Sequence, residues 1–201
     1  SDVATVTKGG QVTAVSDGAA EIKLTADDGQ TFTVKIVVGR DMSRYPATAR
    51  IMLCGDIMCS LEHQRKAALR SLDFTDAFGT LKETVSSADY SVAVLETTCF
   101  DGAPFEYEKI RTDSGSPNCN SPSTFIDAVK NCGFNALVTA NNHNCDTGLE
   151  GLHATVQRIR NSGMANIGTL DDETHIADIN GIKVGFVAVN SISNGLEKNI
   201  P

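Results

Sequence analysis

The period of the hydrophobic pattern changes once along this chain, and the change separates two structural classes. In the first part apolar residues recur at every second position, most clearly from Phe32 to Val38, which is typical of a β-strand. In the remainder, short apolar runs alternate with stripes of helical spacing, which is typical of an α/β domain with a largely parallel sheet. We therefore predict a small all-β segment at 1–39, a linker at 40–47 and an α/β domain at 48–201.

Turn-forming pairs punctuate the all-β segment at short intervals. They are Gly9-Gly10, Asp17-Gly18 and Asp28-Gly29, and strand-like runs lie between them. Short strands with a turn about every ten residues are typical of a β-sandwich or barrel. The segment resembles the C-terminal part of a bacterial immunoglobulin-like domain of group 2, through Val3–Val6, Gly10–Val15, Gly18–Ile22 and Thr33–Val38. The resemblance implies an extracellular spacer or adhesion module, and an unrelated small β-meander is the alternative.

The α/β part contains candidate strands and helices in alternation. Apolar runs predict strands at 50–54, 91–95, 135–139 and 182–189. Helical stripes predict one helix over 73–86, one that begins at Ser121-Pro122 and ends at Gly133, and one that begins with the capping-box pair Thr147 and Glu150 and ends at Gly163.

Polar side chains follow three of these strands. Asp56 follows the first, Glu96 the second, and the third leads into a loop with Asn142, His143 and Asp146. Because the carboxyl ends of parallel strands meet at one edge of a sheet, we expect these side chains to converge.

The residue types at this edge point to a metal site. Carboxylates, an amide oxygen and an imidazole are ligands of hard or borderline divalent ions such as Mn, Mg, Fe or Zn. The loop also precedes a predicted helix N-terminus, where an anion is favoured. Together these features predict a metal-activated water that acts on a phosphoryl or carboxylate substrate. The alternative for Asp56, Asn142 and Asp146 is a local role in a turn or helix cap.

The six cysteines all lie in the α/β part. They contain no C-x-x-C pair, which argues against a structural zinc site. We expect Cys54 and Cys132 to be buried thiols. A nucleophile–base pair of Cys145 and His143 is disfavoured by their two-residue spacing. The other histidines, His63, His153 and His175, are expected to be solvated or structural.

The charge balance excludes two classes of partner. The chain has 17 basic against 25 acidic residues, a net charge of −8, and no basic stripe. Nucleic acid and anionic membrane surfaces are therefore poor candidates.

Several short motifs are spread over about residues 48 to 195: Gly55–Met58, Leu95–Thr97, Asn120–Pro122, Cys132–Asn135 and, most specifically, the run Thr139–His143 with Asp146 and Gly148. Through these motifs the α/β part resembles bacterial capsule synthesis proteins of the CapA type, involved in poly-γ-glutamate biosynthesis. The resemblance implies the calcineurin-like metallophosphoesterase fold, so the expected fold class is an α/β metallophosphoesterase-like sheet domain preceded by a small immunoglobulin-like segment.

The resemblance also implies roles for individual residues. Asp56, Glu96, Asn142 and Asp146 match metal-binding or acidic motif positions, His143 matches a general acid or transition-state stabiliser, and Asn141 is expected to contact substrate. One motif departs from the family, because Val94 stands where the family has asparagine. The chain also ends at Pro201, before the family's later histidine motifs, which implies a piece of a longer protein or an incomplete site.

Two classes of function follow from these residues. The first is a cell-surface, metal-dependent hydrolase of capsule or poly-γ-glutamate metabolism, acting on an anionic polymer or a phosphoester and working with capsule-synthase membrane partners. The second is a non-catalytic surface module that binds polymer or a partner. An ordinary phosphatase of another pathway is a third possibility, since fold does not fix function.

Overall fold

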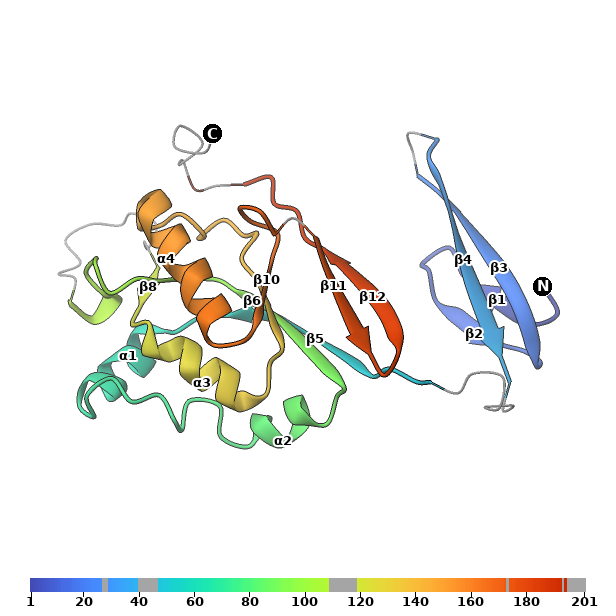
Figure 1. The fold of residues 1–201 in the computed structure, drawn as a ribbon. Coiled ribbons are helices and arrows are strands. Elements are labelled where there is room, and N and C mark those ends of the chain that lie inside the picture. Colours follow the sequence, from blue (N-terminus) through green and yellow to red (C-terminus); the bar gives the residue numbers. More distant parts are fainter. Residues whose placement is uncertain (27–28, 40–46, 109–118, 173, 193, 195–201) are drawn as a thin grey trace. The chain divides into compact units, whose positions relative to one another are not determined.

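The computed structural model describes residues 1–26, 29–39, 47–108, 119–172, 174–192 and 194, so all but the last residue of the predicted linker at 40–47 lies outside the described part. The chain divides into two compact units, Ser1–Thr48 and Ala49–Pro201 (Figure 1). No helix in the described ranges is long and apolar enough to cross a membrane.

The first unit consists of two antiparallel β-hairpins. Strands β1 (Ala4–Val6) and β2 (Val12–Ala14) form one, and β3 (Gly18–Thr25) and β4 (Thr31–Val38) form the other. The strands confirm the period-two pattern. Among the described residues of this unit only Ala4 is buried, so the two sheets do not enclose a core. The immunoglobulin-like architecture stays a prediction.

A four-stranded, all-parallel sheet forms the centre of the second unit. Its order is β10 (Ala165–Ile167), β9 (Ala136–Val138), β6 (Tyr90–Leu95) and β5 (Ile51–Ile57). The predicted strands at 50–54, 91–95 and 135–139 are three of these four, which confirms a parallel α/β sheet. The fourth, β10, was not predicted.

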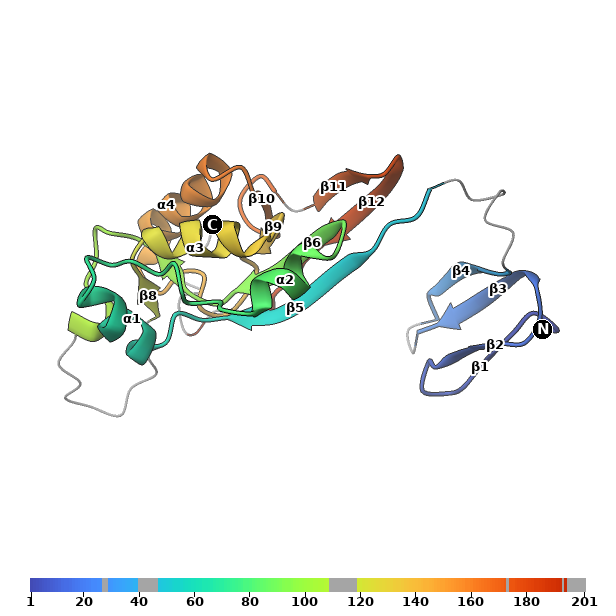
Figure 2. The same ribbon diagram turned by 90° about the horizontal axis from the view of Figure 1, so that it is seen from below.

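Helices cover one face of this sheet. They are α1 (Leu61–Ala68), α2 (Leu81–Ser86), α3 (Thr124–Cys132) and α4 (Gly148–Asn161). Figures 1 and 2 show α3 and α4 on the same side of the sheet. The main core lies between these helices and the sheet. There Phe125 and Val129 of α3 and Ile159 of α4 pack against Leu95 of β6 and Leu137 of β9.

A separate hairpin contributes to the opposite face. Strands β11 (Thr174–Ile179) and β12 (Ile182–Val187) pair with each other in antiparallel register. Phe186 packs there against a second cluster that contains Val92, Ala136 and Ile167. The predicted strand at 182–189 is therefore real, but it lies outside the parallel sheet.

Two predicted helix starts are wrong, whereas Thr147 is the N-cap of α4 as predicted. Residues 73–80 form turns, bends and irregular backbone, and only α2 within 73–86 is helical. The Asp73 side chain accepts hydrogen bonds from the backbone N–H and hydroxyl of Thr75, a local arrangement that competes with helix. Helix α3 has Ser123, not Ser121, as its N-cap, and Thr147 before α4 makes no side-chain cap hydrogen bond.

A short parallel pair brings a distant segment to the sheet edge. Strand β7 (Thr98–Cys99) pairs with β8 (Asn120–Ser121), and a short 3-10 helix, η2 (Glu106–Glu108), lies in the connection. The hydroxyl of Thr98 donates to the Cys119 carbonyl at 2.9 Å. Cys119, just before β8, is thereby held beside the end of β6.

Candidate functional site

The carboxyl edge of the sheet brings Asp56 and Glu96 together. Asp56 lies within β5 and is paired with Val94, after a register shift at Gly55. Glu96 directly follows β6, and its backbone N–H donates to the carbonyl of Ile57 at 3.0 Å. The prediction placed Asp56 just after a strand; the strand is longer, and the bulge of one extra residue allows Asp56 to reach the edge from within it.

The electrostatics at Glu96 show how close these groups are. Burial raises the pKa of Glu96 above its usual range, and the negative charge of Asp56 and a side-chain hydrogen bond with it raise this pKa further. His143 acts in the opposite direction, and Asp146 adds a weaker increase. Four of the five residues expected to converge therefore interact across this edge, and it concentrates negative charge.

The loop after β9 is anchored to β6 by Asn141. Its side-chain amide donates to the Leu95 carbonyl at 2.8 Å, and its side-chain oxygen accepts from the backbone N–H of His143 at 2.9 Å. Asn141 is 7% exposed, so these bonds lie in the interior. The side chain thus positions His143 relative to Glu96; the predicted contact with substrate is not tested by this arrangement.

His143 and Asp146 form a buried pair within this loop. His143 Nδ1 lies 2.7 Å from Asp146 Oδ2. Because a carboxylate only accepts, Nδ1 carries the proton of this bond and Nε2 remains for other chemistry. The amide nitrogen of Asn194 lies 3.3 Å from Nδ1, and Asn142 donates to the side-chain oxygen of Asn194 at 3.2 Å.

Cys119 completes a cluster around this pair; the sequence places it in a loop near this edge but assigns it no role there. Its backbone N–H donates to Asp146 Oδ2. Its sulfur, a nitrogen of His143 and a carboxylate oxygen of Asp146 all lie within 4.8 Å of one another. The segment before β8 carries no periodic signal, and only the pairing of β7 with β8 places it here.

The thiols of Cys59, Cys99, Cys132 and Cys145 are not activated nucleophiles, because burial raises the pKa of each. All six lie in the described part of the chain, and each is a thiol. Cys132 is buried and Cys54 half-buried. Burial raises the pKa of Cys145, and the negative charge of Asp146 adds to the increase, so this thiol stays protonated at neutral pH. A Cys145–His143 nucleophile pair is disfavoured on this ground as well.

The remaining histidines that bond within the described structure have local roles. His63 Nδ1 lies 2.9 Å from the hydroxyl of Ser60, the N-cap of α1. His175 Nε2 lies 2.8 Å from the hydroxyl of Tyr90. These contacts agree with the structural roles expected for them.

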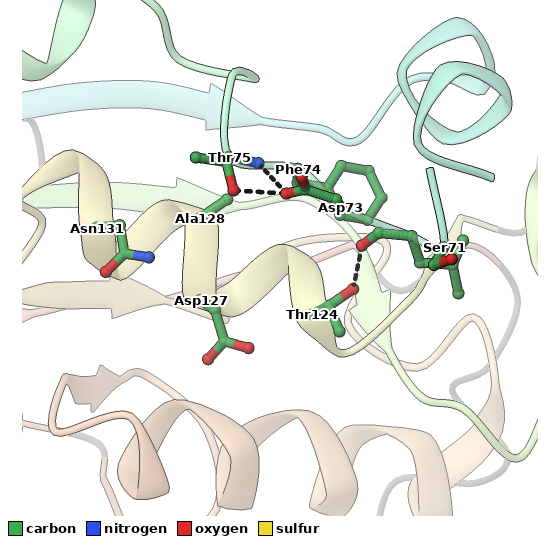
Figure 3. A pocket seen from close by; sticks show the side chains of 9 residues that line it. Ser71, Asp73, Phe74, Thr75, Thr124, Asp127, Ala128 and Asn131 are labelled. Carbon is green, nitrogen blue, oxygen red and sulfur yellow. Dashed lines mark hydrogen bonds between the residues drawn. The ribbon is translucent and has the colours of Figure 1, made fainter. Parts of the chain in front are cut away.

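Of two cavities in this unit, one is separate from the candidate site and the other borders it. The cavity in Figure 3, about 260 Å³, lies between the loop Ser71–Thr75 and helix α3, and it shares no residue with the sheet edge. Asp127 in its wall is already ion-paired with Arg158. A smaller cavity of about 150 Å³ has Cys119 in its wall and therefore borders the cluster.

A parallel sheet with clustered carboxylates, an amide and a His–Asp pair at its carboxyl edge defines this part as an α/β protein of metallophosphoesterase-like fold. The chain belongs to the bacterial capsule synthesis protein family, because the sequence model of that family, PGA_cap, matches residues 50–200. This confirms the resemblance to the CapA type.

Two curated relatives are proteins of Sinorhizobium fredii. They are the uncharacterized proteins y4sH and y4uA, each 31% identical over 91 residues. The match covers 45% of this chain and 20% of each relative, so the chain spans about a fifth of their length.

Proposed function

We propose that the sheet edge is a metal-dependent, phosphoesterase-like hydrolase site that acts on an anionic polymer or phosphoester of capsule or poly-γ-glutamate metabolism. The observation that carries the proposal is the contact between Asp56 and Glu96 beside the buried His143–Asp146 pair. The family match supports the link to capsule polymer.

The donor set fits a divalent cation. Asp56 and Glu96 are carboxylates close enough to interact, and the proximity of Asp56 helps to raise the pKa of Glu96. Two like charges in such a position are relieved by a bound cation. Asp56, Glu96 and Asn142 would hold the ion through oxygen atoms; the sequence also predicts Asp146 as a ligand. When bound, a divalent ion polarises a phosphoryl oxygen and lowers the pKa of a coordinated water.

The chain's own residues supply orientation and proton transfer. Asp146 accepts from His143 Nδ1, which fixes the imidazole ring and leaves Nε2 to hold the proton for the leaving group. Asn141 fixes the backbone of His143 relative to β6. Helix α4 begins at Gly148, directly after this loop, so its positive end favours an anionic substrate group.

Location and partners belong to the same proposal. Capsule polymer is a cell-surface product, so we place this protein at the bacterial surface, where capsule-synthase membrane proteins are suitable partners. The net charge of −8 supports the expectation that nucleic acid is not a substrate.

The test is metal content together with hydrolysis of a simple phosphodiester. After loading with Mn²⁺, elemental analysis should find stoichiometric Mn²⁺ in the wild type and little in Asp56→Asn. His143→Ala should retain metal and lose hydrolysis of bis-p-nitrophenyl phosphate, by about 100-fold or more. Asp76→Asn, an aspartate paired with Arg70 away from the edge, is the control and should behave as wild type.

A folded wild type that binds no Mn²⁺ would overturn the hydrolase proposal. Circular dichroism of each variant would establish that the fold is retained. If the wild type is folded and binds no such metal, a non-catalytic surface module that binds polymer or a partner becomes the better account.

A further inference from the structure

Cys119 is held rigidly against the His143–Asp146 pair. Its backbone N–H donates to Asp146 Oδ2. Its carbonyl accepts from the backbone N–H of Thr98 at 3.1 Å and from the Thr98 hydroxyl at 2.9 Å. Both ends of the residue are therefore fixed, and the thiol has a defined position next to the imidazole and the carboxylate.

The three buried side chains offer a sulfur, a nitrogen and an oxygen atom as possible metal ligands. Cys119 is 5% exposed, His143 8% and Asp146 9%, and their ligand atoms lie within 4.8 Å of one another. Thiolate and imidazole together select borderline or soft ions such as Zn²⁺, Co²⁺ and Cd²⁺ over Mg²⁺ and Mn²⁺. This set is chemically distinct from the carboxylates of Asp56 and Glu96, which suit hard ions.

Some buried polar atoms without a hydrogen-bond partner belong to the His143 loop or to the wall of the cavity that Cys119 lines. Within the described ranges, three buried side-chain oxygen atoms have no hydrogen-bond partner: Gln64 Oε1, Asn144 Oδ1 and Thr147 Oγ1. Gln64 lines the cavity of about 150 Å³ that includes Cys119, and the other two belong to the loop that carries His143 and Asp146. Buried acceptors of this kind normally have a partner, and water bound to an ion in the cluster would supply donors in this region.

We propose that Cys119, His143 and Asp146 form a site for a thiophilic divalent ion, with Zn²⁺ as the physiological candidate, and that an ion there withdraws His143 from its role in hydrolysis. The inhibitory consequence rests on the proposed function, whereas the binding does not. On binding, the S–H bond of Cys119 breaks, a sulfur–metal bond forms, and the thiol proton leaves to solvent. The His143 proton moves from Nδ1 to Nε2, so the neutral imidazole gives its Nδ1 lone pair to the ion in place of its hydrogen bond with Asp146, and no electrons are transferred.

The binding is tested by titration with Co²⁺ and Cd²⁺, followed by near-ultraviolet absorption. A thiolate ligand produces a sulfur-to-metal charge-transfer band, which oxygen ligands do not. We expect the band in the wild type and its loss in Cys119→Ser. Cys145→Ser is the control and should retain the band, because Cys145 is a buried thiol in the loop of His143 and Asp146 that is not part of the cluster. Cys119→Ala provides a second variant if the serine variant does not fold.

The inhibition is tested by adding Zn²⁺ to protein that hydrolyses bis-p-nitrophenyl phosphate with Mn²⁺. The Zn²⁺ concentration needed for half-inhibition should rise about tenfold or more in Cys119→Ser and remain unchanged in Cys145→Ser. Metal bound without a sulfur band in the wild type would overturn this inference and leave the hydrolase proposal intact. A band without any metal-dependent hydrolysis would leave the thiophilic site intact and overturn the hydrolase proposal.

Discussion

The side-chain amide of Asn141 donates to the backbone carbonyl of Leu95 at 2.8 Å, and this bond joins the loop after β9 to the end of β6. The same side chain accepts from the backbone N–H of His143. Asn141 therefore fixes the position of His143, which follows β9, relative to the end of β6.

Replacement of Asn141 by alanine should destabilise the fold by about 1–3 kcal/mol, because it leaves the Leu95 carbonyl and the His143 N–H without their partner in the interior. Urea unfolding measures the change. Asn161→Ala is the matched control: that side chain accepts one exposed hydrogen bond from Gln157, so its loss should stay within about 0.5 kcal/mol. Equal effects of the two substitutions would contradict the anchoring role of Asn141.

Asp146→Asn separates two roles for this carboxylate. As the hydrogen-bond partner of His143, Asp146 orients the imidazole, so the variant should keep its metal and lose about 10- to 100-fold in hydrolysis rate. If Asp146 is instead a metal ligand, as the sequence predicts, the Asp146→Asn variant should lose metal as Asp56→Asn does. Elemental analysis beside the steady-state rate distinguishes the two, and we expect the first result.

The buried thiol of Cys59 should make stability fall at high pH. Burial raises the pKa of Cys59 to about 12, against an ordinary value of 9.0, and a hydrogen bond with Ser121 only partly offsets this. Above pH 9 the unfolded chain loses the thiol proton while the native state retains it, so the free energy of unfolding decreases as pH rises toward 12.

The size of this effect at pH 10 is about 1 kcal/mol. The measurement is urea unfolding at pH 7 and pH 10 for the wild type and Cys59→Ala. The variant should be less stable at pH 7, because it leaves a cavity, yet lose less stability between the two pH values. A parallel decline in both proteins would contradict the assignment.

Gly133→Ala should be more damaging than Gly163→Ala. Both glycines end helices with positive φ, 114° and 79°, so each alanine incurs backbone strain of about 1–2 kcal/mol. A methyl group on Gly133 would also lie 2.5 Å from the hydroxyl oxygen of Ser86, whereas one on Gly163 meets nothing within 4 Å. Ser86 cannot turn away freely, because it donates to the Cys132 carbonyl. Comparison of the two denaturation midpoints isolates the steric part, and equal midpoints would argue against it.

Long, periodic segments could be predicted from the sequence, and short or polar ones could not. Strand β6 and helix α4 show clear apolar spacing. Strand β10 is a three-residue run with a buried asparagine, Asn166, at its centre. Helix α1 has the fully buried polar residue Gln64 on its inner face, so neither element has an apolar pattern to recognise.

The candidate site was predictable to the extent that parallel strands share an edge. This rule brought Asp56, Glu96 and His143 together from three distant segments. It could not reveal Cys119, whose position depends on the two-residue strand β8 and on hydrogen bonds with Thr98 and Asp146. The detailed role of Asp146 likewise depends on which nitrogen of His143 it contacts, and only the folded loop determines this.

The parallel pairing of the sheet has a kinetic consequence for the site. β5 joins β6 with Ile51 opposite Tyr90, and β6 joins β9 with Val92 opposite Ala136, so each pairing closes a long stretch of chain. Such non-local contacts form slowly during folding. The side chains at the carboxyl edge can meet only after both pairings exist. The site is therefore a late product of folding, and a nascent or partly unfolded chain lacks it even where its individual helices have formed.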